Sequence, residues 1–417
     1  MNLENNRIFL GLNNIASQLC DLKNSFNKNG CKTFLVSQSP QNNLVQDCYD
    51  INILNIKNRV GYFYPKKISQ RVKNYYDSII DNYIFKKSIA NCDIFIFMWS
   101  TFRKDNSDLA ILKALNKKIV IFLVGDDVRW KPAMEKDFKL QNCNPYEYLD
   151  YNYSVSNLDS KLRYLRNVEK YADIIYSNPL SNQLSLRPYC HFWYPINLEC
   201  IKENLIQRKV PKIIHSPSDY VIKGTKYILS AIEKLKSDGL DFDFELIQNM
   251  PNKDILKKYT DSDILIGQMF STYGGKQERE CLAAGCVVVS SFKVNYFYNN
   301  KFSKGITDCP IVDVSPNTLY NKLKDLIKNQ TKRKLISSKG RGYVNKYHNS
   351  DFLSKEIIKN ITTQPIYDYY PSFYTKKYIP EPDPKYLNVY NKWNKYVMDS
   401  NWYKETVKSD ERDGLVF

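Results

Sequence analysis

The sequence has few histidines and no paired cysteines, and both absences exclude familiar kinds of site. Its 417 residues include three histidines and ten cysteines, and no two cysteines form a C-x-x-C pair. This scatter offers no metal-site spacing and predicts a reduced, cytoplasmic chain. His191, His215 and His348 have no recognisable nucleophile or ligand paired with them, so we expect structural roles for them.

Long apolar runs are missing as well. No segment approaches the roughly 18 apolar residues of a spanning helix, and the first residues lack the apolar stretch of a signal peptide. If the protein works at a membrane, we therefore expect it to lie on the surface. RNP, KH and helix-turn-helix signatures are also missing, so no specific nucleic acid is expected as a partner.

A strong positive charge is present. The chain has 61 Lys and Arg residues against 44 Asp and Glu, which gives a formal net charge of +17. This balance favours anionic partners such as nucleotides, acidic membrane surfaces or nucleic acid. The chain is also too long for one ordinary domain, so two are expected.

Apolar runs and helical stripes alternate along the chain. The segments 93–98 and 118–124 are continuous apolar runs, as expected for strands covered on both faces, and leucines at helical spacing separate them. The same alternation restarts at 212–215. Repeated βα units predict right-handed crossovers and parallel sheets.

A polar connector at 195–210 divides the two runs. We therefore expect an α/β protein of two Rossmann-like domains, over 1–195 and 211–361, that face a central cleft. The remaining segment, 362–417, is aromatic and basic. We expect it to be a tail that packs back on the first domain, because its tyrosines are bulky and amphipathic.

A glycine turn before a short predicted helix is the most informative motif. Gly274 and Gly275 precede this helix, and Glu280 lies less than two turns into it. Glycine lets the backbone approach a ligand closely, and the free N–H groups at a helix start favour an anion. An anion site beside a carboxylate suits a nucleotide sugar, which carries a diphosphate and a hydroxyl-rich ribose.

A second motif, Lys223-Gly224-Thr225, follows the first strand of the second half and begins a helix. Its ammonium group could neutralise a phosphate. Taken alone, Lys223 also fits a solvent lysine, and Glu280 also fits a surface glutamate favoured by the helix dipole. Both residues follow strands, so the carboxyl edge of one sheet could bring them together.

These motifs resemble the nucleotide-sugar half of GT-B glycosyltransferases of the retaining family-four type, the glycosyl transferases of group 1. The matching segments are His215–Ser218, Lys223–Thr225, Glu280–Val289 and Gly340–His348, with Gly125–Arg129 similar to an acceptor-side loop of the first domain. The resemblance covers roughly residues 7–361. It implies transfer of a sugar from a nucleoside-diphosphate sugar to a glycan, lipid-linked or other hydroxyl acceptor, with retention and without a metal or other cofactor.

The resemblance also implies roles for particular residues. Lys223 is expected to bind the donor diphosphate and Glu280 the ribose hydroxyls, and both are expected to be catalytic together with Asp127. The further donor-binding residues are Gly274, Gly275, Thr272, Ser216, Ser218 and Gln268. The acceptor-side residues are Asn13, Asn14, Asp126, Asp127 and Arg129.

Three positions depart from the family pattern. Thr272 stands where a glutamate is usual, and Ser218 stands where many relatives have an arginine. A histidine common at the cleft edge of the first domain is absent, and Asp126 and Asp127 lie near that point. Arg279 or Lys276 could supply the missing positive charge.

The segment 57–87 is basic and aromatic, and two interpretations of it stay open. It could make peripheral contact with an anionic membrane, or it could be a solvated helix that packs its aromatic rings on its own domain. Two alternatives to the transferase also remain. One is a nucleotide-sugar epimerase of the same fold, and the other is a non-enzymatic basic protein that binds membranes or nucleic acid. The sequence indicates no oligomeric state.

Overall fold

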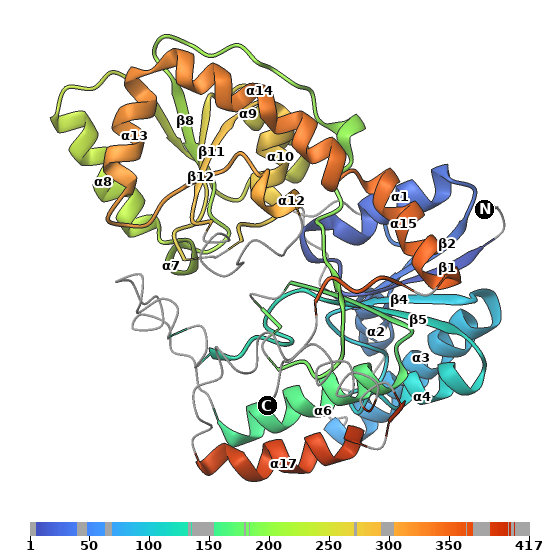
Figure 1. Ribbon diagram of the computed structural model, residues 1–417. Helices are drawn as coiled ribbons and strands as arrows, with labels where there is room; N and C mark the ends of the chain where they lie inside the picture. Colours follow the sequence, from blue (N-terminus) through green and yellow to red (C-terminus); the bar gives the residue numbers. More distant parts are fainter. Residues whose placement is uncertain are drawn as a thin grey trace.

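The computed structural model describes residues 6–39, 48–62, 69–131, 135, 154–178, 181–182, 184–270, 273–292, 304–363, 365–369, 384–398, 400–401 and 404. Two α/β units follow one another along the chain, and each is built on its own sheet (Figure 1). Every pairing between the named strands is parallel. The predicted fold class, an α/β chain with two parallel sheets, is therefore confirmed.

The first unit holds a seven-stranded sheet in the order β3-β2-β1-β4-β5-β6-β7. Its central strands are buried along most of their length, as expected where helices cover both faces. The strands are β1 Arg7–Leu12, β2 Lys32–Ser37, β3 Ile51–Asn52, β4 Ile94–Met98, β5 Lys118–Leu123, β6 Ile174–Ser177 and β7 Cys190–His191. The helices are α1 Gln18–Lys28, α2 Ile53–Tyr62, α3 Gln70–Asn91, α4 Ser107–Ala114 and α6 Val155–Tyr171, with a short 3-10 turn at Ile15–Ser17.

The second unit holds a five-stranded sheet in the order β12-β11-β10-β8-β9. Its strands are β8 Lys212–His215, β9 Asp243–Leu246, β10 Ile264–Ile266, β11 Val287–Ser290 and β12 Val312–Asp313. Its helices are α7 Tyr220–Lys223, α8 Thr225–Ser237, α9 Asn252–Thr260, α10 Lys276–Ala284, α12 Lys304–Thr307, α13 Leu319–Lys328 and α14 Gln330–Tyr347. A 3-10 turn at Leu198–Cys200 lies in the connector between the units.

Two later helices return to the first unit. Helix α15, Ser350–Thr362, lies against α1, where the Ser25 hydroxyl donates to Ser350 Oγ at 2.8 Å. Helix α17, Pro384–Met398, lies along α6 (Figure 1). There Trp393 Nε1 donates to Asp159 Oδ1 at 2.8 Å. The described part of the tail thus buries aromatic side chains against the first unit.

One cysteine pair departs from the expectation of a fully reduced chain. Cys20 in α1 and Cys48 before β3 form a disulfide, and none of the other described cysteines is in one. Their separation of 28 residues gives no sequence signal, because the two come together only when α1 packs beside β2 and β3. In a separate observation, none of the helices in the described ranges is long and apolar enough to cross a bilayer.

Candidate functional site

The carboxyl ends of β8, β10 and β11 bring several predicted residues together. Lys223 ends the short helix after β8, and Gln268 lies just beyond β10. The Lys223 Nζ donates a hydrogen bond to Gln268 Oε1 at 2.9 Å. Ser290, the last residue of β11, accepts the Gln268 N–H at 3.0 Å. The three strand ends thus form one polar surface around an ammonium group.

Charged side chains of both units shift the pKa of the Lys223 ammonium group. Burial lowers its pKa, the Glu278 carboxylate raises it, and the Arg129 guanidinium lowers it. Arg129 belongs to the loop after β5 of the first unit, where its Nε donates to Ser181 Oγ at 3.4 Å. Positive charge from the first unit therefore acts on the polar surface of the second, and both cations favour an anionic ligand there.

Glu278 is the residue that the sequence interpretation missed. Its fully buried carboxylate accepts the Gly275 N–H at 2.8 Å and the Ser290 hydroxyl at 3.2 Å. A glutamate three residues after a helix N-cap is the pattern of a capping box, so the sequence did contain a signal. This carboxylate uses the Gly275 N–H that was predicted to meet the ligand.

Gly274 is a position where only glycine fits well. Its φ is +70°, in the left-handed region, and a Cβ there would lie 2.6 Å from Arg279 Nη1. Arg279 is fully buried, and its guanidinium carbon lies 4.5 Å from the centre of the Tyr273 ring. Its Nε and Nη2 have no hydrogen-bond partner in the described part of the chain. A buried cation surrounded by aromatic faces thus supports the glycine turn from behind.

Glu280 lies on another face of α10 and contacts the first unit through Lys276. The Lys276 Nζ lies 3.4 Å from Glu280 Oε1 and 2.5 Å from Asp21 Oδ2, and it donates to the Ala16 carbonyl at 2.8 Å. All three charged side chains are buried. Burial raises the pKa of Asp21 and of Glu280. Burial lowers the pKa of Lys276, but the two carboxylates raise it by more, so that the pKa is raised. This ionic contact, from α1 to α10, joins the two units.

The predicted residues of the first unit bind groups of their own loops or of a neighbouring loop. Asn14 is buried and accepts the Leu19 N–H at 2.8 Å, and Asn13 donates to Ser100 Oγ at 2.6 Å. The Asp127 carboxylate accepts the N–H groups of Gly125 at 2.7 Å and of Val124 at 3.3 Å. Burial raises the pKa of Asp127 to about 6.

The other predicted positions have varied surroundings. The Asp126 carbonyl accepts a hydrogen bond from Lys161. The Ser216 carbonyl accepts one from Gln277 Nε2 at 3.1 Å, while Ser218 is exposed. Thr272 lies outside the described residues. Of the acceptor-side set, Arg129 is thus the residue whose charge reaches Lys223.

The histidines are buried within hydrogen-bonded clusters. His215 Nε2 pairs with Thr225 Oγ1 at 2.9 Å and its Nδ1 with the Ile266 carbonyl at 2.8 Å. Burial lowers its pKa to about 4. His191 pairs with Tyr273 and Tyr369 hydroxyls, and burial lowers its pKa to about 3. Within the described residues, no three His, Cys, Asp or Glu side chains gather as a metal site would need.

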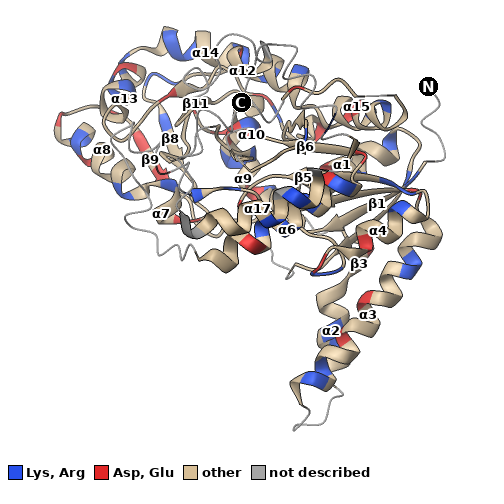
Figure 2. Ribbon diagram, turned by 60° about the horizontal axis from the view of Figure 1, so that its bottom comes forward, with Lys and Arg blue, Asp and Glu red and all other residues tan. Residues whose placement is uncertain are grey.

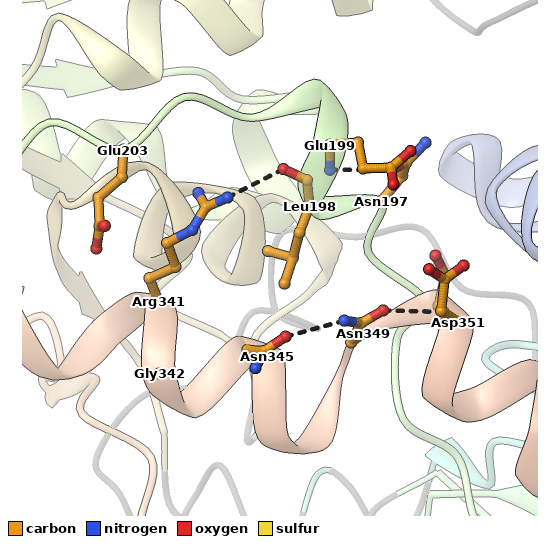
Figure 3. A pocket seen from close by; sticks show the side chains of 10 residues that line it. Asn197, Leu198, Glu199, Glu203, Arg341, Gly342, Asn345, Asn349 and Asp351 are labelled. Atoms are coloured by element: carbon orange, nitrogen blue, oxygen red, sulfur yellow. Dashed lines mark hydrogen bonds between the residues drawn. The ribbon is translucent and has the colours of Figure 1, made fainter.

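A polar pocket of about 550 Å³ lies elsewhere, between the connector and the end of α14 (Figure 3). Arg341 crosses it to donate to the Leu198 carbonyl at 3.1 Å, and Asn349 Nδ2 donates to Asn345 Oδ1 at 2.9 Å. None of the predicted site residues lines it. We therefore do not take this pocket as the candidate site, despite its size. We assign the candidate site to the surface around Lys223.

Comparisons with known proteins bear on the fold. No family model matches the chain, and no match is found among curated proteins. Among solved structures, the chain is similar to an alpha-glucosyltransferase in complex with UDP-glucose and DNA containing an abasic site, at 13% identity and a TM-score of 0.54, over 86% of this chain and 99% of that one. It is also similar to the sucrose-phosphate synthase of Thermosynechococcus elongatus, at 11% identity and a TM-score of 0.53, over 85% and 98% of the two chains. It is similar to TarM as well, at 7% identity and a TM-score of 0.53, over 86% of this chain and 99% of that one. The chain therefore has the GT-B glycosyltransferase fold that its motifs predict.

Proposed function

We propose that the protein is a glycosyltransferase that moves a sugar from a nucleoside-diphosphate sugar to a hydroxyl acceptor. One observation carries the proposal: Lys223, Gln268 and the start of α10 meet at the carboxyl edge of the second sheet, with Arg129 opposite. Ligands of open parallel sheets bind at this edge. The shared fold with transferases solved with UDP or UDP-glucose supports the same assignment.

The chemistry rests on the charge of the leaving group. When the nucleoside diphosphate departs, negative charge develops on its terminal phosphate. We propose that the Lys223 ammonium group, held by its hydrogen bond to Gln268, donates a further hydrogen bond to this phosphate and that Arg129 adds positive charge from the first unit. Preorganised donors at such an oxygen stabilise the transition state without needing to reorient. We propose that this transfer proceeds with retention of configuration and needs no metal.

Glu280 is proposed to bind the ribose hydroxyls, as the resemblance implies. In the structure its carboxylate lies beside Lys276, whose Nζ also contacts Asp21 and the Ala16 carbonyl. Ribose binding would then release Glu280 from this contact. The nucleotide therefore competes with Lys276 for Glu280 within α10, beside the contact of Lys276 with Asp21 that joins the two units.

Asp127 is proposed to act by position. Its carboxylate accepts two backbone N–H groups of the 124–129 loop, so it fixes the segment that carries Arg129. The acceptor, a glycan or a lipid-linked or other hydroxyl compound, is proposed to bind on this side of the cleft. Asn13 and Asp126 lie in the loops of that side.

The direct test is the release of nucleoside diphosphate from a panel of nucleotide sugars, with and without hydroxyl acceptors. The proposal expects acceptor-dependent release that Lys223→Ala abolishes. Conversion of the donor without any acceptor would instead indicate an epimerase. Absence of both release and nucleotide binding would leave a non-enzymatic binding protein.

A further inference from the structure

Helices α2 and α3 form a hairpin that projects from the first unit. Figure 2 shows the two helices extending together away from both sheets. The Lys57 Nζ and a carboxylate oxygen of Asp81 lie 2.8 Å apart and tie α2 to α3. Helix α2 begins directly after β3, at the edge where the parallel strands β1 and β4 also end. The hairpin is therefore rooted at the cleft edge of the first sheet.

The outer face of α3 carries a row of exposed apolar side chains. Val72 is 42% exposed, Tyr75 64%, Ile79 46% and Tyr83 66%. These positions follow one another at spacings of three and four residues, so they lie along one side of the helix. The next turn ends this row, because Ile84 and Phe85 are buried against the domain. We call Val72, Tyr75, Ile79 and Tyr83 the apolar stripe.

Basic side chains lie beside and in line with the apolar stripe. At 3.6 residues per turn, Arg71 falls next to the Tyr75 edge of the stripe and Lys86 falls in line with it beyond Tyr83, and both are exposed. The acidic residues Asp77 and Asp81 fall on the opposite side of α3 and are only half-exposed. The outward side of the hairpin therefore combines apolar surface with positive charge alone.

We propose that the apolar stripe is a docking surface for an anionic lipid bilayer. A helix with an apolar face rimmed by Lys and Arg lies in the plane of a membrane interface, with its tyrosines at the headgroup level. The exposed aliphatic side chains of Val72 and Ile79 match acyl chains and offer nothing to a phosphodiester backbone. A second copy of the chain would bring the same positive rim against itself, at a net charge of +17 per chain.

Docking through this hairpin would hold the cleft edge of the first sheet close to the membrane. This consequence rests on the proposed function, because it makes a lipid-linked or membrane-borne glycan the natural acceptor. The docking itself does not depend on it. Nucleotide binding, measured separately, distinguishes failure of one idea from failure of the other.

The test is co-sedimentation of the full chain with vesicles of phosphatidylcholine alone or mixed with phosphatidylglycerol. We expect binding to the anionic vesicles that weakens with salt. A variant with Arg71→Glu and Lys86→Glu should lose at least about 25-fold in partitioning, since each basic residue near the surface contributes about fivefold, or about 1 kcal/mol. A variant with Val72→Ser and Ile79→Ser should lose about tenfold or more.

Matched controls lie on the exposed side of α14. Lys334 and Lys339 are exposed, and Leu335 is 61% exposed. A variant with Lys334→Glu and Lys339→Glu, and a second with Leu335→Ser, carry the same kinds of change. The electrostatic attraction of the whole chain predicts losses in all charge variants, whereas the proposal predicts that only the hairpin variants lose binding by these factors.

Several outcomes would overturn the proposal. One is that the wild type does not bind anionic vesicles. Another is that both hairpin variants bind them as strongly as the wild type does. A dimer that becomes monomeric in the Val72→Ser and Ile79→Ser variant, measured by light scattering without vesicles, would make the stripe an interface between copies. Duplex DNA binding that depends on Arg71 and Lys86 without vesicle binding would assign the surface to nucleic acid.

Discussion

The loops of the two sheets are used differently. In the second unit, Lys223, Gln268 and Ser290 come from three strand ends and bind one another across the edge of the sheet. In the first unit, Asn13 after β1 and Ser100 after β4 also bind each other across the edge, whereas Asn14 and Asp127 satisfy backbone groups of their own loops. Because the Asp127 carboxylate binds N–H groups of its own loop, it can hold Arg129 in place without taking part in the chemistry. We therefore propose that the second unit, whose sheet edge holds the Lys223 ammonium group, binds the ligand and that the first unit positions Arg129.

The comparison predicts its largest effect at Lys223. Replacing it with alanine removes the cation that we propose for the leaving phosphate, so kcat should fall by about 100- to 1,000-fold, or about 2.7–4 kcal/mol. Steady-state kinetics measures this. Lys253→Ala, at an exposed position of α9, is the control and should leave kcat unchanged. Equal effects of the two changes would remove Lys223 from the site.

His215 in the second unit and Asp127 in the first should contribute to stability with opposite dependences on pH. His215 in the second unit has its pKa lowered by burial to about 4. Its contribution to stability is therefore present above about pH 6.5 and is lost as the pH falls through 4. A His215→Gln variant should lose stability less steeply over that range, by up to about 3 kcal/mol. Urea denaturation at several pH values measures the difference, and parallel curves would contradict it.

Asp127 in the first unit should behave in the opposite way. Its pKa is raised by burial from 3.8 to about 6. Its contribution is present below pH 3.8 and is lost as the pH rises through about 6. The difference in unfolding free energy between the wild type and Asp127→Asn should therefore shrink as the pH rises over this window. A difference that grows with pH would contradict a pKa of Asp127 that burial raises.

The cost of replacing a glycine can be compared between Gly224, in the candidate site, and Gly239, on an open surface. Gly224 and Gly239 have nearly the same φ, +72° and +73°. A Cβ on Gly224 would lie 2.7 Å from Met269 Cβ, whereas nothing lies within 4 Å of one on Gly239. Alanine should cost about 1–2 kcal/mol at both positions through the backbone alone, and more at Gly224, where the loop after β10 must also move. Thermal unfolding measures both; equal costs would mean that this loop yields freely.

The smallest effect is expected for the activity of Asp127→Asn. A positioning residue whose amide replacement still accepts a backbone N–H should cost about tenfold or less in kcat/KM, with an unchanged pH profile. A general base at this position would cost about 100- to 10,000-fold. Kinetics across pH decides between these two roles, and the larger loss would return Asp127 to the reacting atoms.

Local patterns account for the part of the fold and site that could be predicted. Apolar runs marked the buried strands β4 and β5. Lys223 and the glycine turn were found because each lies between a strand and the start of a helix. Glu278 was missed because it and Glu280 are two residues apart on a helix. That spacing puts them on different faces, and the sequence does not say which face meets the sheet.

Other features depend on contacts that no local pattern contains. The disulfide between Cys20 and Cys48 requires α1 to pack beside β2 and β3. The contact of Lys276 with Asp21 joins two residues that are separated by more than half of the chain. The spacing of Val72, Tyr75 and Ile79 does predict a stripe on one helical face. Whether that face is buried or exposed became visible only in the structure.

The central claim is that the second unit binds a nucleoside diphosphate between Lys223 and Glu280. Calorimetric titration with a panel of nucleoside diphosphates tests it most directly, using the wild type, Lys223→Ala, Glu280→Ala and Lys276→Met. We predict that the wild type binds at least one of them, that Lys223→Ala and Glu280→Ala weaken binding, and that Lys276→Met strengthens it by freeing Glu280. Binding that is absent from the wild type, or that is the same in all four proteins, would contradict the account.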